Sequence, residues 1–470
     1  MRICLVNPPS PFLLDERVFP TLGVLQVATV LEEAGHEVVV EDLGGREDYV
    51  TVMAHRASEG WDCYGLTATT PQFPAAVAIL QTIRDVDPTA RAIIGGPHAT
   101  VMPGSCQAFD CVVMGDGESA VLDAIQRGAP HLIDEASNTK KGELAWHWPA
   151  RHLIDMDSYR YTLMGLKGTS MMLSQGCPYN CSFCCGRLVP YYRRVRARNV
   201  DDVVKEMEHL IDQYGMTAVM AFDDEVNLLN EPLLEFCQKI TPLGMKFRAF
   251  VKANLFTDMQ AEAMAKAGFV EVCTGVESGS DRILGIIDKQ TTRVINKRFV
   301  DVAHKHGMRA KAFCSLGHPG ENHESAEDLT SWLSDAAPDD FDVTVITVYP
   351  GSPLWEKREF VEVNERGQRV CKYVKRSKHP EEDGATLYFE EVDYAKEFSF
   401  YKGRPKEYIS HVWTPDLSKG DLVTLRDTIE DKVRKELGIP YPVRHSGDSF
   451  EHSMGQGASP QDSRVLLKEA

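Results

Sequence analysis

The sequence alternates short apolar strands with amphipathic helices, and this pattern restricts the fold more than any other feature. Within residues 1–130 the helices begin or end at Gly or Pro, as in 21–35 and 74–88. The strands are predicted at 2–8, 37–43, 62–70, 91–98 and 110–118. Apolar strands separated by helices form a parallel sheet covered on both faces. We therefore predict an α/β domain with a doubly wound parallel sheet, whose ligands bind beyond the carboxyl ends of its strands.

A second strand–helix series follows residues 131–168, which lose the period and are predicted to form a linker. Its six strands are expected at 169–176, 218–224, 246–253, 271–278, 309–317 and 342–350. Six such units predict a partial (β/α)6 barrel over 169–356, with functional residues at the carboxyl ends of its strands. We expect a small, charged C-terminal extension over 357–445, with a helix near 420–437, and a disordered tail over 446–470.

The composition narrows the possible partners. The 470-residue chain has 51 Lys and Arg against 69 Asp and Glu, which gives a formal net charge of −18. This balance argues against nucleic acid, which needs a basic surface, and it is compatible with a cationic small-molecule substrate. No apolar run approaches the roughly 20 residues of a membrane span, and no signal peptide is evident. We expect a cytoplasmic protein without membrane contact.

Four of the twelve cysteines lie within nine positions, in the segment SQGCPYNCSFCCGR (174–187). A reducing cytosol disfavours a disulfide framework, and structural zinc sites usually add a second, distant pair of ligands. Cys177, Cys181 and Cys184 instead stand on one predicted loop after the first barrel strand. Three thiolates so placed suit a [4Fe–4S] cluster with one iron left open. We interpret the adjacent Cys185 as a packing residue.

The C-x3-C-x2-C spacing, with Phe183 before the last cysteine, resembles the signature of the radical S-adenosylmethionine (SAM) superfamily. The resemblance implies that Cys177, Cys181 and Cys184 hold the cluster, and that the amino and carboxylate groups of SAM chelate its open iron. It also implies the superfamily's chemistry. The reduced cluster cleaves SAM to methionine and a 5′-deoxyadenosyl radical, which abstracts hydrogen from the substrate while the protein orients the groups.

Other segments of the barrel resemble the same superfamily in the same order. AFDDEVNLL (221–229) looks like its acidic segment near the SAM amino group, which implies Asp223 and Asp224 as acceptors. TGVESGSDRIL (274–284) is similar to its fourth-strand segment. That likeness implies three residues near the SAM ribose: Gly275, Glu277 and Ser278.

The resemblance continues to residue 356. KQTTR (289–293) supplies Lys289 and Arg293 as candidate carboxylate partners. SLGHPGENHES (315–325) and VYPGSPLWE (348–356) are similar to the family's fifth-strand turn and closing element. Four residues at these strand ends are candidates for the acid or base beside the radical: Glu321, His318, Tyr349 and Glu356.

The N-terminal domain resembles the cobalamin-binding arrangement that precedes the barrel in B12-dependent radical SAM enzymes. NPP, GGPHAT and GDGE, after the first, fourth and fifth strands, carry this likeness. It implies a corrin crevice lined by small residues, among them Thr67, Gly95, Gly96 and Gly115. The D-x-H-x-x-G motif that supplies an axial histidine in other B12 proteins is missing, so bound cobalamin is expected to be base-off.

Three functions remain open at this point. We favour cobalamin-dependent C-methylation of a small molecule, with a sugar or aminosugar natural product as the expected class. The second is B12-independent dehydration or epimerisation of an aminosugar, because relatives of this kind include the radical diol dehydratase of apramycin biosynthesis. The third is an iron–sulfur electron-transfer protein. The first two need a small-molecule substrate and a reducing partner such as flavodoxin, ferredoxin or an NADPH-linked reductase.

Overall fold

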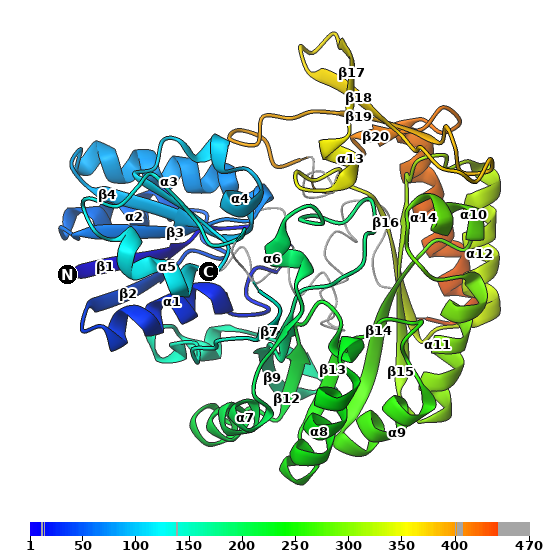
Figure 1. Ribbon diagram of the computed structural model, residues 1–470, viewed down its shortest axis with the longest axis horizontal. Coiled ribbons are helices and arrows are strands. Elements are labelled where there is room, and N and C mark those ends of the chain that lie inside the picture. The colour runs from blue at the N-terminus through cyan, green and yellow to red at the C-terminus, as the bar shows by residue number, and fades with distance from the viewer. Residues whose placement is uncertain (11–12, 14, 138–139, 400, 402–407, 440–470) are drawn as a thin grey trace.

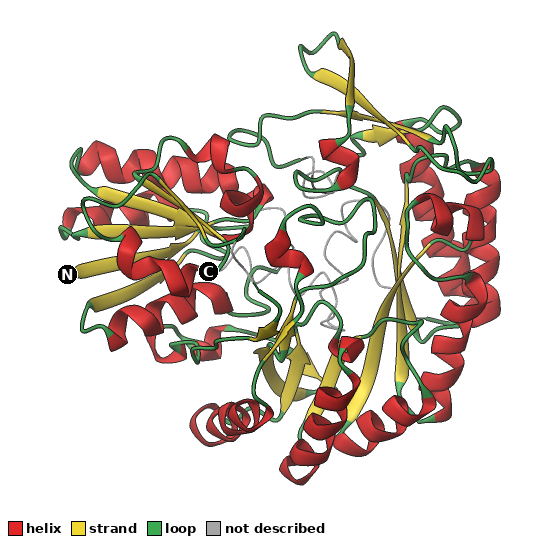
Figure 2. Cartoon of the chain, in the orientation of Figure 1, coloured by secondary structure: helices red, strands yellow, loops and turns green. Residues whose placement is uncertain are grey.

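The computed structural model describes the chain except for residues 11–12, 14, 138–139, 400, 402–407 and 440–470 (Figure 1). The tail expected to be disordered, 446–470, lies outside the described residues. Figure 2 shows two parallel sheets with helices along them and a third, antiparallel sheet near the C-terminus.

The N-terminal sheet has the strand order β2-β1-β3-β4-β5-β6 and is parallel throughout. Its strands are β1 (Arg2–Asn7), β2 (Glu37–Asp42), β3 (Cys63–Thr67), β4 (Arg91–Gly95), β5 (Cys111–Met114) and β6 (Leu132–Asp134). The helices are α1 (Leu22–Glu33), α2 (Tyr49–Ser58), α3 (Phe73–Val86), α4 (Gly96–Val101) and α5 (Gly117–Ala124). Apolar residues of α1 and α5 pack on one face, and those of α2 and α3 on the other. The predicted doubly wound sheet is confirmed, and β6 extends it beyond residue 130.

The second large sheet is a curved half-barrel with the order β16-β15-β14-β13-β12-β9-β8. All its neighbours pair in parallel except β8 with β9. The strands are β8 (Thr162–Leu163), β9 (Leu166–Met171), β12 (Ala218–Ala221), β13 (Lys246–Phe250), β14 (Phe269–Glu277), β15 (Arg309–Leu316) and β16 (Asp340–Val345). Six parallel strands in chain order confirm the predicted partial (β/α)6 barrel.

Helices cover the outer face of this barrel, as Figure 1 shows. They are α7 (Val200–Tyr214), α8 (Asn230–Ile240), α9 (Asp258–Ala267), α10 (Asp281–Ile286), α11 (Arg293–Lys305) and α12 (His323–Ala336). Sequence explains their ends: Asn199 caps α7 through its side chain, and Gly215 ends it in a left-handed conformation.

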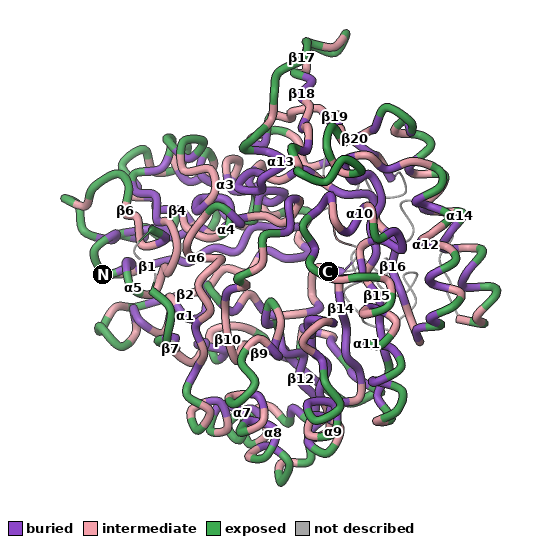
Figure 3. The backbone as a smooth tube through the Cα atoms, turned by 45° about the vertical axis from the view of Figure 1, so that its right-hand side comes forward, coloured by how far each residue is buried: buried purple, intermediate pink, exposed green. Residues whose placement is uncertain are grey.

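The C-terminal extension is an antiparallel sheet followed by a long helix. Its elements are α13 (Pro353–Glu356), β17 (Glu359–Val363), β18 (Arg369–Val374), β19 (Thr386–Glu390), β20 (Val412–Trp413) and α14 (Lys419–Leu437). The helix expected near 420–437 is therefore present as α14. Figure 3 shows the strands of the half-barrel largely buried, whereas the hairpin of β17 and β18 projects with β17 exposed along its length.

The extension covers the open edge of the half-barrel. In β16, Val343 N donates to Glu430 of α14 at 2.6 Å, and Val343 O accepts from Arg426 Nε at 3.1 Å. Val345 N donates to the hydroxyl of Tyr408 at 2.9 Å. Side chains thus satisfy backbone groups that an edge strand would otherwise expose to pairing with another chain.

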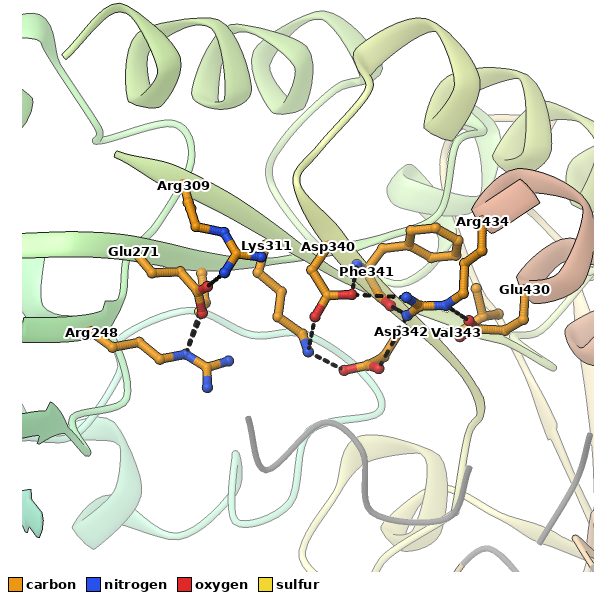
Figure 4. Close-up of polar contacts among 11 residues, drawn as sticks. Arg248, Glu271, Arg309, Lys311, Asp340, Phe341, Asp342, Val343, Glu430 and Arg434 are labelled. Carbon is orange, nitrogen blue, oxygen red and sulfur yellow. Dashed lines mark hydrogen bonds and ion pairs between the residues drawn. The ribbon is translucent and has the colours of Figure 1, made fainter. Parts of the chain in front are cut away.

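Buried ion pairs tie the strands to this helix (Figure 4). Lys311 of β15 is 1% exposed and contacts Asp340 at 2.8 Å and Asp342 at 3.0 Å, both on β16. Arg434 of α14 reaches Asp340 at 3.0 Å and Glu430 at 2.6 Å. Buried charges are tolerated only when they are paired. These ion pairs therefore fix α14 against the barrel.

Candidate active site

The loop that carries the predicted cluster cysteines is fixed by its backbone. It follows β10 (Ser174–Gln175) and is entered through Gly176, which has a left-handed φ of 92°. A Cβ at Gly176 would lie 2.3 Å from the carbonyl oxygen of Arg194, so only glycine fits. Cys184 N donates to Cys181 O at 3.1 Å. These contacts keep the three thiols on one tight loop.

The three thiols share one buried cation. Arg187 is 3% exposed and donates to Cys177 O at 2.8 Å. Its guanidinium also interacts electrostatically with the thiols of Cys177, Cys181 and Cys184, and none of these cysteines is in a disulfide. Burial raises the pKa of Cys177 and of Cys184, and the charge of Arg187 opposes that rise; the thiolate is the form that binds iron.

The donor set of three thiols fits an iron–sulfur cluster. Among the described residues, no three or more His, Cys, Asp or Glu surround a point where one metal ion could bind. A four-iron cluster takes one thiolate at each of three irons, so its ligands need not converge on one point. Cys185 has the contacts of a packing residue, because its thiol donates to Pro350 O at 3.3 Å.

The acidic pair after β12 binds the protein's own backbone. Asp223 is 3% exposed and accepts from Leu173 N at 3.0 Å and from Ser174 Oγ at 2.7 Å. Burial raises the pKa of Asp223 to about 6. Asp224 accepts from Gly176 N at 2.9 Å. Both carboxylates therefore support the entrance to the cysteine loop, and their contact with SAM stays a prediction.

Glu225, which the sequence patterns did not single out, carries the free acceptor of this segment. Its Oε2 is buried and has no hydrogen-bond partner within the described part of the chain. Burial raises the pKa of Glu225 to about 7, against the opposing effect of Lys289 and Lys252. The only signal in the sequence is that Glu225 is the third acidic residue in a row.

Glu277 ends β14 in a left-handed conformation, with φ 62°. Its Oε1 accepts from Lys289 Nζ at 2.9 Å and its Oε2 from Ser315 Oγ at 2.8 Å. A Cβ at Gly275 would lie 2.5 Å from Glu277 Oε1 and 2.7 Å from Lys289 Nζ, so the glycine makes room for this pair. Burial would raise the pKa of Glu277, but Lys289 lowers it below its usual value. Lys289 Nζ also lies 5.9 Å from the ring centre of Phe183.

Two other residues of the predicted SAM site make local contacts. Ser278 is 1% exposed, and its Oγ accepts from Ser280 N at 3.2 Å. Arg293, at the start of α11, donates to Asp328 of α12 at 3.3 Å, so it is not joined to the Lys289–Glu277 pair. Their contacts with SAM stay predictions.

The turn after β15 holds two of the four acid–base candidates, whereas Glu356 lies in α13 and accepts from Gly351 N at 3.1 Å. His318 and Glu321 are both fully buried. Glu321 accepts from Ser325 Oγ at 2.7 Å and from His318 N at 3.3 Å, and burial raises its pKa to about 7. Glu321 therefore holds the turn together. Tyr349 follows the next strand, and its ring centre lies 6.1 Å from that of Tyr401.

At the carboxyl edge of the N-terminal sheet, backbone segments approach closely. Gly96 has φ 88°, and a Cβ there would lie 2.4 Å from Thr67 Oγ1. Gly115 has φ 86°, and a Cβ there would lie 2.6 Å from Ala136 N. Gly95 ends β4 beside Thr67, which ends β3. We call this edge of small residues the cradle; the glycines let neighbouring backbone segments pack closely there, and the contact of these residues with a corrin stays a prediction.

The histidine beside this cradle is not available as a metal ligand. His98 is fully buried; its Nδ1 lies 3.3 Å from Thr70 Oγ1 and its Nε2 2.8 Å from Ser105 Oγ. Its ring stacks on Phe73 at 3.9 Å. Burial lowers the pKa of His98 to about 4. Both ring nitrogens are engaged, in keeping with the missing axial-histidine motif.

An ion pair joins the carboxyl edge of the N-terminal sheet to the cysteine loop of the half-barrel. Arg196, in β11 (Arg196–Ala197), donates to both carboxylate oxygens of Asp116 at 2.5 and 3.2 Å. The same guanidinium donates to Gln175 at 2.8 Å, directly before the cysteine loop. Asp116 follows β5, so this contact holds the cysteine loop against the cradle of the N-terminal sheet.

Comparison with known protein families identifies both parts of this architecture. The family model described as the radical SAM superfamily matches residues 171–333, and the one described as the B12 binding domain matches residues 16–125. The protein is a radical SAM enzyme with a B12-binding domain. Within the described part of this radical SAM enzyme, every helix is too short or too polar to cross a bilayer.

Sequence relatives span most of the chain. An uncharacterised methyltransferase of Pyrococcus horikoshii is 28% identical over 76% of this chain and 83% of its own. An anaerobic magnesium-protoporphyrin IX monomethyl ester cyclase of Cereibacter sphaeroides is 26% identical over 73% of this chain, which spans 61% of the cyclase. The hopanoid C-3 methylase of Methylococcus capsulatus is 24% identical over 76% of this chain and 72% of its own.

Solved structures share the fold. The radical SAM methyltransferase TsrM from Kitasatospora setae, with cobalamin and a [4Fe–4S] cluster bound, gives a TM-score of 0.69 at 17% identity and covers 98% of this chain and 99% of its own. The cobalamin-dependent radical enzyme OxsB, with aqua-cobalamin and SAM bound, gives 0.56 at 16% identity over 71% of this chain and 51% of its own. At these identities the likeness concerns the fold.

Proposed function

We propose that this radical SAM enzyme is a cobalamin-dependent methyltransferase of a small molecule. The observation that carries the proposal is the pairing of two edges: the cradle at Gly96 and Gly115 lies against the cysteine loop through the Arg196–Asp116 contact. A corrin in that cradle would face the barrel. The names of the Pyrococcus and Methylococcus relatives favour methyl transfer over the alternatives.

In this proposal Cys177, Cys181 and Cys184 hold the [4Fe–4S] cluster, with Arg187 offsetting their charge. The bound cluster supplies the electron that cleaves SAM to a 5′-deoxyadenosyl radical. Asp223 and Asp224 keep the loop rigid through Leu173 N and Gly176 N, so the thiolates are positioned before the cluster binds.

The SAM-binding residues are proposed on the same side of the barrel. Glu277 accepts from the ribose hydroxyls, because its carboxylate oxygens keep lone pairs beside those used by Lys289 and Ser315. Glu225 accepts from the SAM ammonium through its unpartnered Oε2. The positive charges of Lys289 and Lys252 partly balance the negative charges of the carboxylates around Glu225.

The substrate class, electron donor and location belong to the proposal as well. A net charge of −18 supports a cationic substrate such as an aminosugar. Reduction would come from flavodoxin, ferredoxin or an NADPH-linked reductase in the cytoplasm. The competing function, dehydration or epimerisation of an aminosugar without B12, uses the same barrel and leaves the cradle empty.

The products formed from SAM test the proposal. Anaerobic enzyme with its cluster, hydroxocobalamin, SAM, a low-potential reductant and a candidate aminosugar substrate should yield 5′-deoxyadenosine, S-adenosylhomocysteine and the methylated aminosugar. Desalted protein should also retain about one equivalent of base-off corrin. Formation of 5′-deoxyadenosine alone, by protein that retains no corrin, would replace the methyltransferase with the dehydratase or epimerase.

A further inference from the structure

His318 carries an acceptor that no described group uses. The residue is fully buried in the turn after β15, and its Nδ1 is buried without a hydrogen-bond partner among the described residues. A buried polar atom left unpaired is energetically costly. Such an atom in a native fold needs an explanation, and a ligand that donates to it is one.

The hydrogen bonds around His318 fix which ring nitrogen holds the proton. Ser315 Oγ donates its single proton to Glu277 Oε2 at 2.8 Å. The same oxygen lies 2.8 Å from His318 Nε2, so it can only accept there. Nε2 must then carry the hydrogen, and in the neutral ring Nδ1 keeps a lone pair.

The ring is neutral, because burial lowers the pKa of His318 to about 4. Its surroundings belong to the SAM side of the barrel. The His318 ring meets the Phe183 ring edge-on at 5.2 Å between centres, and Phe183 precedes the last cluster cysteine. Through Ser315 the imidazole is joined to Glu277, the residue proposed at the ribose.

We propose that His318 is a positioning residue whose Nδ1 accepts a hydrogen bond from the nucleoside of SAM, rather than an acid or base in the reaction. The donor is an N–H or O–H group: the adenine 6-amino group or a ribose hydroxyl. This inference rests on the proposed SAM site. Glu277, Ser315 and His318 then form one chain of hydrogen bonds that positions the nucleoside beside the cluster.

The test compares three substitutions in full-length, anaerobically reconstituted enzyme. His318→Leu removes both nitrogens, and His318→Asn can keep an amide oxygen near the position of Nδ1. His318→Gln can reach Ser315 but leaves the Nδ1 position without an acceptor. The dissociation constant of SAM, measured by equilibrium dialysis, should rise roughly 3- to 10-fold in the Leu and Gln variants. The Asn variant should bind more tightly than both.

Exposed His55, which lies on α2 of the other domain, provides the matched control, because His55→Leu should leave SAM binding unchanged. Iron content and thermal unfolding show whether each variant folds. If His318→Leu fails to fold, the Asn–Gln comparison decides. Rescue by Gln and not by Asn would overturn the inference, because the contact with Ser315 would then be the one that matters.

Nucleoside analogues separate the two sources of the donor. 5′-Deoxyadenosine is compared with 5′-deoxyinosine, which lacks the amino group, and with its 2′-deoxy and 3′-deoxy forms. The analogue that lacks the donor should bind wild type and His318→Leu equally. Sensitivity to His318→Leu that persists with every analogue would overturn the inference.

The same measurements keep two failures apart. Wild-type enzyme that holds its cluster but binds no SAM would overturn both the proposed function and this inference. Wild-type enzyme that binds SAM no more tightly than His318→Leu would overturn the inference alone.

Discussion

The two parallel sheets end in edges of opposite chemical character. Where β3, β4 and β5 end, the chain places four small residues and one carboxylate, Asp116, which pairs with Arg196; the small residues are Thr67, Gly95, Gly96 and Gly115. Where β12, β13 and β14 end, it places charged ones: Asp223, Asp224, Glu225, Lys252 and Glu277. In the proposed function the first edge would select its ligand by shape and the second by charge. One architecture, a parallel sheet with helices, thus serves two kinds of recognition.

The largest expected effect is the loss of the iron–sulfur cluster, which changes the charged edge alone. Cys181→Ala should abolish the cluster, so that anaerobic reconstitution gives no stable iron, because three thiolates are needed to hold it. Retention of hydroxocobalamin should be unchanged, since the cradle is formed by other residues. Iron and sulfide assays with a desalting experiment measure both, and Cys185→Ala is the control that should keep about four irons. Iron kept by Cys181→Ala but lost by Cys185→Ala would mean that other thiols bind the cluster.

The reciprocal substitution is made at the carboxyl edge of the N-terminal sheet and should affect corrin binding alone. Gly96→Trp should abolish corrin retention and leave iron content intact, because a Cβ at this position would lie 2.4 Å from Thr67 Oγ1 and the indole would have to displace Thr67 or occupy the proposed corrin site. Gly104→Trp is the matched control in the same domain, since a Cβ there meets nothing within 4 Å. Equal corrin retention by both variants would contradict a ligand in this cradle.

A buried histidine in each region sharpens the comparison, and His98 predicts a pH dependence. Its pKa falls from 6.5 to about 4 in the fold, so the unfolded chain takes up the proton first. Stability should therefore fall as the pH drops from about 6.5 to 4, by up to roughly 3 kcal/mol. Urea unfolding of wild type and His98→Gln measures this. The variant should lose less stability over that interval, and parallel pH profiles would contradict a neutral buried His98.

The smallest effect concerns SAM at the charged edge. Glu277→Ala should weaken SAM binding by about 1–3 kcal/mol, the usual cost of leaving hydrogen-bonding groups unpaired, while the cluster stays. Equilibrium dialysis measures the change, with exposed Glu362→Ala as control. An unchanged dissociation constant would limit Glu277 to its structural pairing with Lys289.

Long apolar strands and the cysteine spacing could be predicted from the sequence, because burial of a parallel sheet leaves continuous apolar runs. β6 and β20 could not, since strands of three and two residues leave no period to detect. Glu225 was missed because an unpartnered oxygen is a property of packing. The contact of Arg293 with Asp328 depends on how α11 meets α12, which residue spacing does not encode.

The two buried histidines show the same limit. His98 and His318 both lie in turns or short helices after strands, and nothing in the sequence separates them. The structure does, because both nitrogens of His98 are engaged, whereas Nδ1 of His318 is not.

The cover that α14 forms over β16 has a consequence for synthesis on the ribosome. Val343 leaves the ribosome long before Arg426, Glu430 and Arg434, whose side chains contact the β16 backbone. At about 5–20 residues per second the interval is several seconds or more. During that time the nascent half-barrel has an open strand edge that another nascent chain can pair with. The yield of folded enzyme should therefore depend on chaperone supply and on the rate of translation past residue 345 more than on the stability of the finished protein. Slower translation should lower the yield, because it lengthens the time for which the edge is open.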